Sequence, residues 1–151
     1  MSPRSQSAGV ADDAPDLAAL ARQRVLDAHA ETVEAVLDCA DSVAASWNGP
    51  STTDPEGVTA PLRAELDARG AWARLPDVLA DAVGAAGFSL PASPVAAPPY
   101  VAATSRGPVL RATLPEGRLV LVVRAFEVER DPTRYVRGAT AVPPAVCATF
   151  K

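Results

Sequence analysis

Apolar and polar positions alternate most clearly over residues 95–137, where three β-branched runs are separated by two similar turns. The turns occupy residues 105–107 (Ser-Arg-Gly) and 115–117 (Pro-Glu-Gly). Glycine in the third place of each turn is typical of a hairpin connection, because glycine adopts the left-handed backbone at no steric cost. The pattern predicts a three-stranded antiparallel meander around which the rest of the chain is organised.

The same turns set the register that we expect for the meander. A three-residue turn with a glycine bulge places Thr104 opposite Pro108 and Leu114 opposite Arg118. Counting by twos then assigns residues to two faces, of which we expect the first to meet the helices. The first face holds Tyr100, Ala102, Thr104, Leu110, Ala112, Leu114, Val120, Val122, Phe126 and Val128, with Arg118, Arg124 and Arg130.

The second sheet face is also apolar at its centre, where Val109, Leu119, Leu121 and Val123 fall together. A sheet that is buried on one side shows a cleaner alternation than this. Three explanations are open: part of the helical half wraps this face, a partner chain covers it, or it holds a ligand.

Apolar residues at helical spacing predict one long helix over residues 15–47. Two shorter helices are predicted at residues 60–69 and 71–86. Residues 89–99 hold four prolines, which mark an extended linker. Residues 146–150 are expected to add a short edge strand or to pack on the second face.

These elements predict an α+β fold, in which a long N-terminal helix and two shorter helices pack on a three- to four-stranded antiparallel β-meander. The length predicts a single domain over residues 15–151, with a helical half at residues 15–88 and a strand half at residues 99–150. Residues 1–14 are polar and unpatterned, and we expect a disordered tail there.

The charge is divided unevenly along the chain. Residues 1–94 hold 6 basic and 14 acidic residues, a net charge of −8, whereas residues 95–151 hold 8 basic and 4 acidic residues, a net charge of +4. Either the two halves complement each other within the domain, or the strand half presents a surface to anions.

Few residues are suited to metal binding or nucleophilic catalysis. The chain has one histidine, His29, and two cysteines, Cys39 and Cys147. His29 and Cys39 fall on the predicted long helix about 15 Å apart along its axis, so they cannot share a metal ion while that helix is intact. The sequence contains neither a phosphate-binding glycine motif nor a nucleophile elbow. We predict no catalytic residue, no metal and no cofactor.

Two widely separated cysteines do not suggest a disulfide framework. No apolar run reaches the length needed to span a bilayer, and the N-terminus lacks the apolar core of a secretory signal. We therefore expect a cytoplasmic protein without a membrane segment.

Arginine supplies thirteen of the fourteen basic residues, and seven arginines fall between residues 106 and 137. The planar guanidinium matches carboxylate and phosphate geometry, so this cluster is the best candidate for an anion or partner contact. The candidate contact residues are Arg111, Arg130, Arg134, Tyr135 and Arg137.

The leading hypothesis is a non-enzymatic interaction module that binds a second copy or another protein through the second sheet face. The alternative is a regulator or nucleic-acid-associated protein that uses the Arg-rich strand half. An enzyme ranks third, because it needs a pocket in which arginines converge with Tyr135 and an acid.

The composition is rich in Ala and Arg, acidic and poor in Lys, and residues 98–138 read PPYVAATSRGPVLRATLPEGRLVLVVRAFEVERDPTRYVRG. These features resemble small uncharacterised haloarchaeal proteins that form a domain-of-unknown-function family. The resemblance covers about residues 20–137, implies no known activity and brings no catalytic residues. The acid content, 18 of 151 residues, is low for a strongly halophilic cytosol and leaves a GC-rich actinobacterial origin open.

Overall fold

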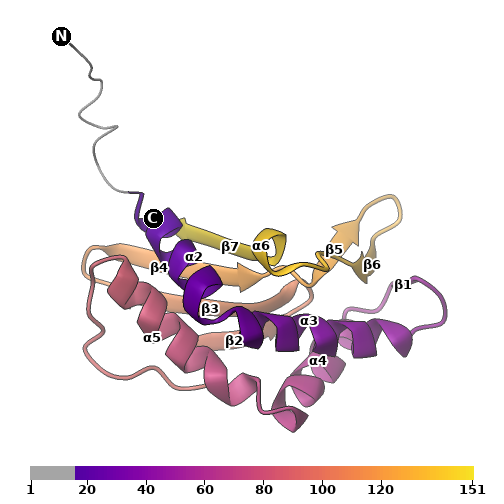
Figure 1. Cartoon of the computed structure of the whole chain (residues 1–151). Coiled ribbons are helices and arrows are strands. Elements are labelled where there is room, and N and C mark those ends of the chain that lie inside the picture. Colours follow the sequence, from indigo (N-terminus) through magenta and orange to yellow (C-terminus); the bar gives the residue numbers. More distant parts are fainter. Residues whose placement is uncertain (1–15) are drawn as a thin grey trace.

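Two antiparallel sheets and a layer of helices make up the fold in the computed structural model, which describes residues 16–151 (Figure 1). The predicted tail at residues 1–14 lies outside the described residues. The helices are α2 (Leu17–Ala28), α3 (Ala30–Ala45), α4 (Glu56–Ala68), the 3₁₀ turn η1 (Trp72–Arg74), α5 (Leu75–Ala85) and α6 (Val142–Ala145). The strands are β1 (Ser51–Thr52), β2 (Val101–Thr104), β3 (Gly107–Leu114), β4 (Gly117–Val123), β5 (Phe126–Glu129), β6 (Arg134–Arg137) and β7 (Val146–Phe150). The predicted α+β class is confirmed.

The larger sheet has the strand order β2-β3-β4-β7 and contains the two predicted hairpins. The predicted register is wrong by one residue, because Thr104 pairs with Gly107 and Leu114 pairs with Gly117. Both glycines do take positive φ angles, 140° and 155°, but they belong to the strands and leave loops of two residues. A Cβ on Gly107 would overlap the carbonyl oxygen of Val123, which explains why glycine is needed there.

A shift of one residue moves side chains to the other side of a strand. Leu110 pairs with Leu121 and Ala112 pairs with Leu119, so these residues share one face. This face is the buried one. The predicted second face is therefore wrong: Leu119, Leu121 and Val123 are 0%, 2% and 5% exposed and belong to the core. Its fourth predicted member, Val109, lies on the opposite side and is half-buried.

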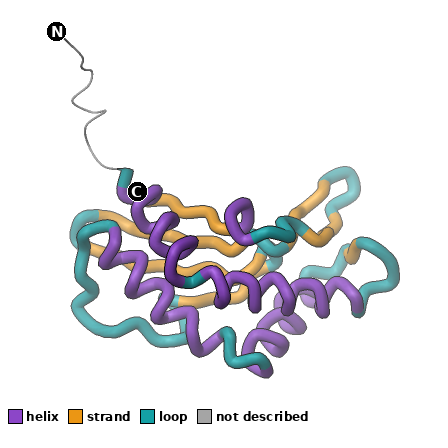
Figure 2. Tube along the Cα trace, viewed as in Figure 1, coloured by secondary structure: helices purple, strands orange, loops and turns teal. Residues whose placement is uncertain are grey.

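The helices lie on one side of the larger sheet (Figure 2). α2 packs against α5 and against β7, α5 packs against β3, and α4 lies beside the edge strand β2. The chain's own helices cover Leu119, Leu121 and Val123, but on the same face as Leu110 and Ala112, so no separate apolar face is left for the three explanations to account for. The predicted strand at residues 146–150 forms the other edge of this sheet.

The predicted long helix is two helices, α2 and α3, that meet at His29. The N–H of His29 bonds to the carbonyl of Val25 and its carbonyl accepts from Val33, so the backbone stays bonded on both sides of the break. The two helices pack on different elements, α2 on α5 and β7, and α3 on α4 and β6. Each helix therefore follows its own packing direction, which a single straight helix cannot do.

The third predicted strand is divided at Arg124 and Ala125 into β4 and β5, which lie in different sheets. The N–H of Ala125 bonds to the carbonyl of Arg106, and that of Arg124 bonds to the carbonyl of Ala145. β5 and β6 then form a hairpin that projects from the body of the domain, and β1 completes the smaller sheet, in the order β1-β6-β5 (Figure 1). Among residues 16–151, no helix is long and apolar enough to cross a membrane.

Candidate interaction surface

The side of the larger sheet that faces away from the helices is the candidate surface, and we call it the outer sheet face. Along β3 the buried and exposed side chains alternate strictly from Val109 to Leu114, and the outward set is partly or fully exposed. The pairing register extends this set across all four strands. The outer sheet face consists of Ala102, Val109, Arg111, Thr113, Arg118, Val120, Val122, Cys147 and Thr149.

An apolar row crosses the outer sheet face from one edge to the other. Val109 pairs with Ala102 on one side and with Val122 on the other, and Val122 pairs in turn with Cys147. All four side chains are half-buried, as is Val120 two residues from Val122. Cross-strand neighbours of this kind touch one another, so the row forms a continuous apolar strip that is rich in β-branched side chains.

Two arginines border this strip. Arg111 pairs with Val120, and Arg118 pairs with Thr113. The two arginines are therefore diagonal neighbours on the same face, with Cα atoms roughly 7–8 Å apart. Both side chains are exposed. Lys151 adds a third basic residue at this end, where its backbone N–H and C=O bond to those of Arg118.

The predicted contact residues do not come together. Arg111 lies on the outer sheet face, whereas Arg130 and Arg134 lie on the projecting hairpin. Arg134 bonds to Glu129 across that hairpin at 2.6 Å. Tyr135 is half-buried between Val128 and β1. These residues therefore do not form the pocket of arginines around Tyr135 and an acid that the enzyme hypothesis needs.

The side chain of Arg137 is bound within the protein rather than exposed to a partner. Its side chain is 16% exposed, and its Nη1 donates to the carbonyl oxygens of Ala125 and Ala139 at 2.6 and 2.7 Å. Its Nη2 donates to the carbonyl oxygen of Leu37 at 3.2 Å, and its Nε pairs with Asp41 at 2.8 Å. The guanidinium thus ties α3 to the junction between the two sheets and offers little to a partner.

Cys147 lies at the end of the apolar strip, beside a group of charges. The Nη1 of Arg124 is 3.9 Å from its sulfur, and the Nη2 of Arg124 bonds to both carboxylate oxygens of Glu127 at 3.0 Å. The hydrogen bonds to Cys147 and then to Glu127 raise the pKa of the Arg124 guanidinium. Glu127 also pairs with Arg106 at 3.8 Å, so one carboxylate is shared by two arginines at this end.

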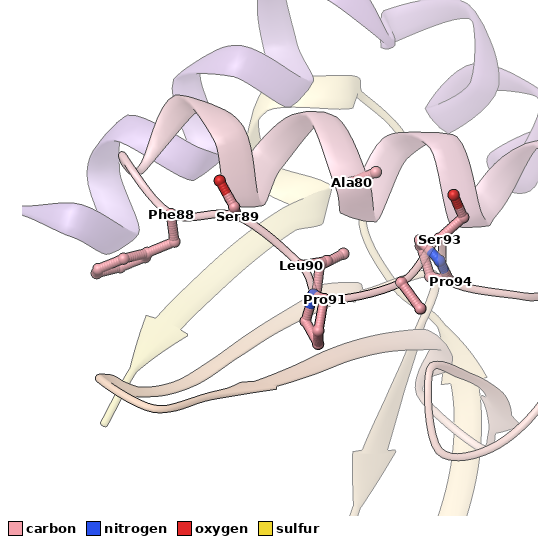
Figure 3. Close-up of a pocket in the computed structure, with 8 residues that line it drawn as sticks. Ala80, Phe88, Ser89, Leu90, Pro91, Ser93 and Pro94 are labelled. Carbon is pink, nitrogen blue, oxygen red and sulfur yellow. The ribbon is translucent and has the colours of Figure 1, made fainter.

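One hollow, of about 320 Å³, lies at the end of the outer sheet face and is lined by Thr113, Leu114, Pro115, Glu116, Gly117, Arg118 and Lys151. The other hollows lie beside the helices. One hollow of about 440 Å³ lies between α5 and the loop that follows it, and Figure 3 shows that loop running alongside the helix with Ser89 and Ser93 as its hydroxyl groups. Its lining carries no charged side chain: Ala80, Phe88, Ser89, Leu90, Pro91, Ala92, Ser93 and Pro94.

A second hollow, of about 310 Å³, lies between α4 and the edge strand β2 and is largely apolar. In it the guanidinium of Arg63 stacks 3.9 Å above the ring of Trp72. A third hollow, of about 400 Å³, is acidic and includes Glu34, Asp38 and Asp41 of α3. Within residues 16–151, no three His, Cys, Asp or Glu side chains are placed to hold a metal ion.

A family model for a domain of unknown function, DUF7988, matches residues 19–149. The chain belongs to the DUF7988 family. The match confirms the predicted resemblance to a family of unknown function and extends it from α2 to β7, so both sheets and the helical layer belong to the DUF7988 domain. The haloarchaeal origin stays a prediction. No curated protein and no solved structure matches the chain.

Proposed function

We propose that this DUF7988 domain is a non-enzymatic protein-interaction module that acts through its outer sheet face. The observation that carries the proposal is the strip of half-buried valines at Val109, Val120 and Val122, on a face that no helix within residues 16–151 covers. The sequence also predicted binding through one face of the sheet, but the proposed face is opposite to the one that holds Leu119, Leu121 and Val123.

The strip has the properties of a contact surface. β-branched side chains on a sheet are stiff, so they lose little conformational freedom when a partner covers them. Removing apolar surface from water contributes roughly 25 cal/mol per Å², and the strip is continuous across all four strands. A polar and charged border, here Arg111, Thr113 and Arg118, is the usual surrounding of such a centre.

Both cysteines are free thiols, which supports the expected cytoplasmic location.

Photo-crosslinking in cells that express the protein tests the proposal. A photoreactive amino acid at Val120 should give discrete adducts with a partner, whereas the same amino acid at the exposed position Ala64 of α4 should not. Excess unlabelled wild-type chain should compete the adducts away. If Val120 and Ala64 give the same products, or if neither gives any, the outer sheet face is an ordinary solvent-exposed surface and the proposal fails.

Nucleic-acid binding is the second candidate, and the observation that favours it is the group of Arg111, Arg118 and Lys151 on one side of a sheet. Sheets that bind single strands also stack bases on aromatic side chains, and the outer sheet face has none. Fluorescence anisotropy with a labelled oligothymidylate measures this candidate. It is supported if binding weakens steeply with added salt and is lost on Arg111→Glu with Arg118→Glu.

A further inference from the structure

We infer that the partner of the outer sheet face is an acidic protein segment, whose apolar side chains cover the valine strip and whose carboxylates pair with Arg111 and Arg118. This inference rests on the proposed function and names the chemistry of the partner.

The first argument is the pairing of the chain's own arginines. Seven arginines have a carboxylate within 4.0 Å, including Arg24 with Asp81, Arg63 with Asp67 and Arg137 with Asp41. Arg22 instead bonds to the carbonyl oxygens of Pro143 and Val146. Within residues 16–151 the arginines that have no such partner are Arg74, Arg111, Arg118 and Arg130.

The second argument is position. Arg74 and Arg130 are isolated, on η1 and on the hairpin loop, whereas Arg111 and Arg118 are diagonal neighbours on one face. Like charges at this separation repel each other. Glu116 of the adjoining turn lines a hollow together with Thr113 and Arg118, but within residues 16–151 no carboxylate lies within 4.0 Å of either guanidinium. Thr113 lies on the same face, two residues after Arg111 on β3 and directly opposite Arg118 on β4. An anion supplied from outside the chain relieves this repulsion and can accept forked hydrogen bonds from both guanidinium groups.

The third argument decides between a protein and a polyanion. The whole chain carries a net charge of −4, which disfavours the long-range attraction of any polyanion, an acidic protein segment included, so an anion must be recognised at short range. The valine strip lies directly beside the arginines, because Arg111 pairs with Val120. A ligand that satisfies both therefore carries apolar groups next to its carboxylates, which describes an amphipathic acidic segment of a protein.

Isothermal titration with two synthetic peptides tests the inference. One peptide alternates Glu with Val, and the matched peptide has Gln in place of every Glu. The wild-type chain should bind the Glu peptide, with an affinity that falls as salt is added, and should bind the Gln peptide about tenfold less tightly, or about 1.4 kcal/mol. The variant Arg111→Glu with Arg118→Glu should lose the same factor for the Glu peptide.

The control variant is Arg74→Glu with Arg130→Glu, which makes the same change of charge at the other two arginines without a partner. At a salt concentration that screens the effect of overall charge, its affinity for the Glu peptide should be within about twofold of the wild-type affinity. All four side chains are exposed, and circular dichroism and thermal unfolding check that both variants keep the fold.

The outcomes separate the inference from the proposed function. Equal binding of the two peptides, or no binding of the Glu peptide, overturns the inference that the partner is acidic. The crosslinking experiment at Val120 tests the proposed interaction surface independently of this result. Tighter binding of oligothymidylate than of the Glu peptide overturns the protein partner in favour of nucleic acid. If sedimentation instead shows salt-sensitive self-association that Arg111→Glu with Arg118→Glu abolishes, the occupant is a second copy of this chain, and a separate partner is excluded.

Discussion

The indole Nε1 of Trp47 donates a hydrogen bond to the carbonyl oxygen of Gly57 at 3.1 Å. That oxygen lies in the first turn of α4, and the residue four positions later is Pro61, which has no N–H to donate. The tryptophan therefore supplies the hydrogen bond that the helix cannot make for itself, and this is how α4 begins at Glu56 although a proline lies inside it.

The first prediction concerns this hydrogen bond. Trp47→Phe retains an aromatic ring near Phe126, whose ring centroid is 5.8 Å from that of Trp47, but leaves the Gly57 carbonyl without its donor. We expect the free energy of unfolding to fall by about 1–3 kcal/mol, measured by urea denaturation. In the Pro61→Ala background the new backbone N–H can bond to Gly57, so Trp47→Phe should cost less. Equal costs in the two backgrounds would contradict this account.

The second prediction concerns Arg137. Arg137→Met keeps much of the side-chain length but removes the donors to the carbonyls of Leu37, Ala125 and Ala139. The carbonyl of Ala125 keeps the N–H of Gly138 as a donor, so the cost comes from the lost charge-assisted hydrogen bonds of the guanidinium rather than from orphaned acceptors. We expect a loss of roughly 2–4 kcal/mol of unfolding free energy. Arg134→Met is the matched control, because its ion pair with Glu129 is exposed and should contribute at most about 1 kcal/mol. Similar losses in the two variants would argue against the structural role.

The third prediction concerns the pH dependence of stability. Hydrogen bonds from His29 and then from Arg24 lower the pKa of the Asp81 carboxyl below its ordinary value of 3.8. A carboxyl with a lowered pKa in the folded state contributes stability above the unfolded value, and this contribution is lost as the pH falls through the folded value. Asp81→Asn should therefore be less stable than wild type at neutral pH, and the difference should shrink below about pH 4. Urea unfolding across this range measures it, and a difference independent of pH would rule it out.

The fourth prediction concerns the two thiols. Burial raises the pKa of the Cys39 thiol, which is 0% exposed on the inner side of α3. Cys147 is half-buried on the outer sheet face. A thiol reagent should modify Cys147 in the native protein and should reach Cys39 only as fast as the domain unfolds. In Cys147→Ala, rapid native-state modification would mean that Cys39 is accessible after all.

The helical half, the two hairpins of the larger sheet and the turn glycines could be predicted from the sequence, because their signals are local. The register could not, because glycine in the third place of a turn fits a loop of two residues as well as one of three. β3 held the missing information: Val109, Arg111 and Thr113 alternate with Leu110, Ala112 and Leu114, which marks the second set as buried. β4 is apolar on both sides and gave no such signal.

The break between α2 and α3 contains no proline or glycine, so the sequence gives no local signal for it. Its cause is tertiary, since each helix packs on different elements. The same holds for the arginines of the candidate site. A sequence shows how many there are, but the partner of Arg137 is Asp41, 96 residues away, and the carbonyl that Arg22 reaches belongs to Val146, 124 residues away. Which arginines remain available to a partner depends on these long-range contacts.

The packing of α2 against β7 places the first and last described elements side by side (Figure 1). The helical and strand halves are consecutive in the chain, yet neither is complete alone: β7 needs α2 to cover it, and the side chain of Arg22 on α2 bonds to the carbonyl of Val146. Closing this contact requires a loop that includes nearly the whole domain, which is entropically expensive and slow. We therefore expect a cut in the proline-rich linker to yield two fragments that fold only when they associate.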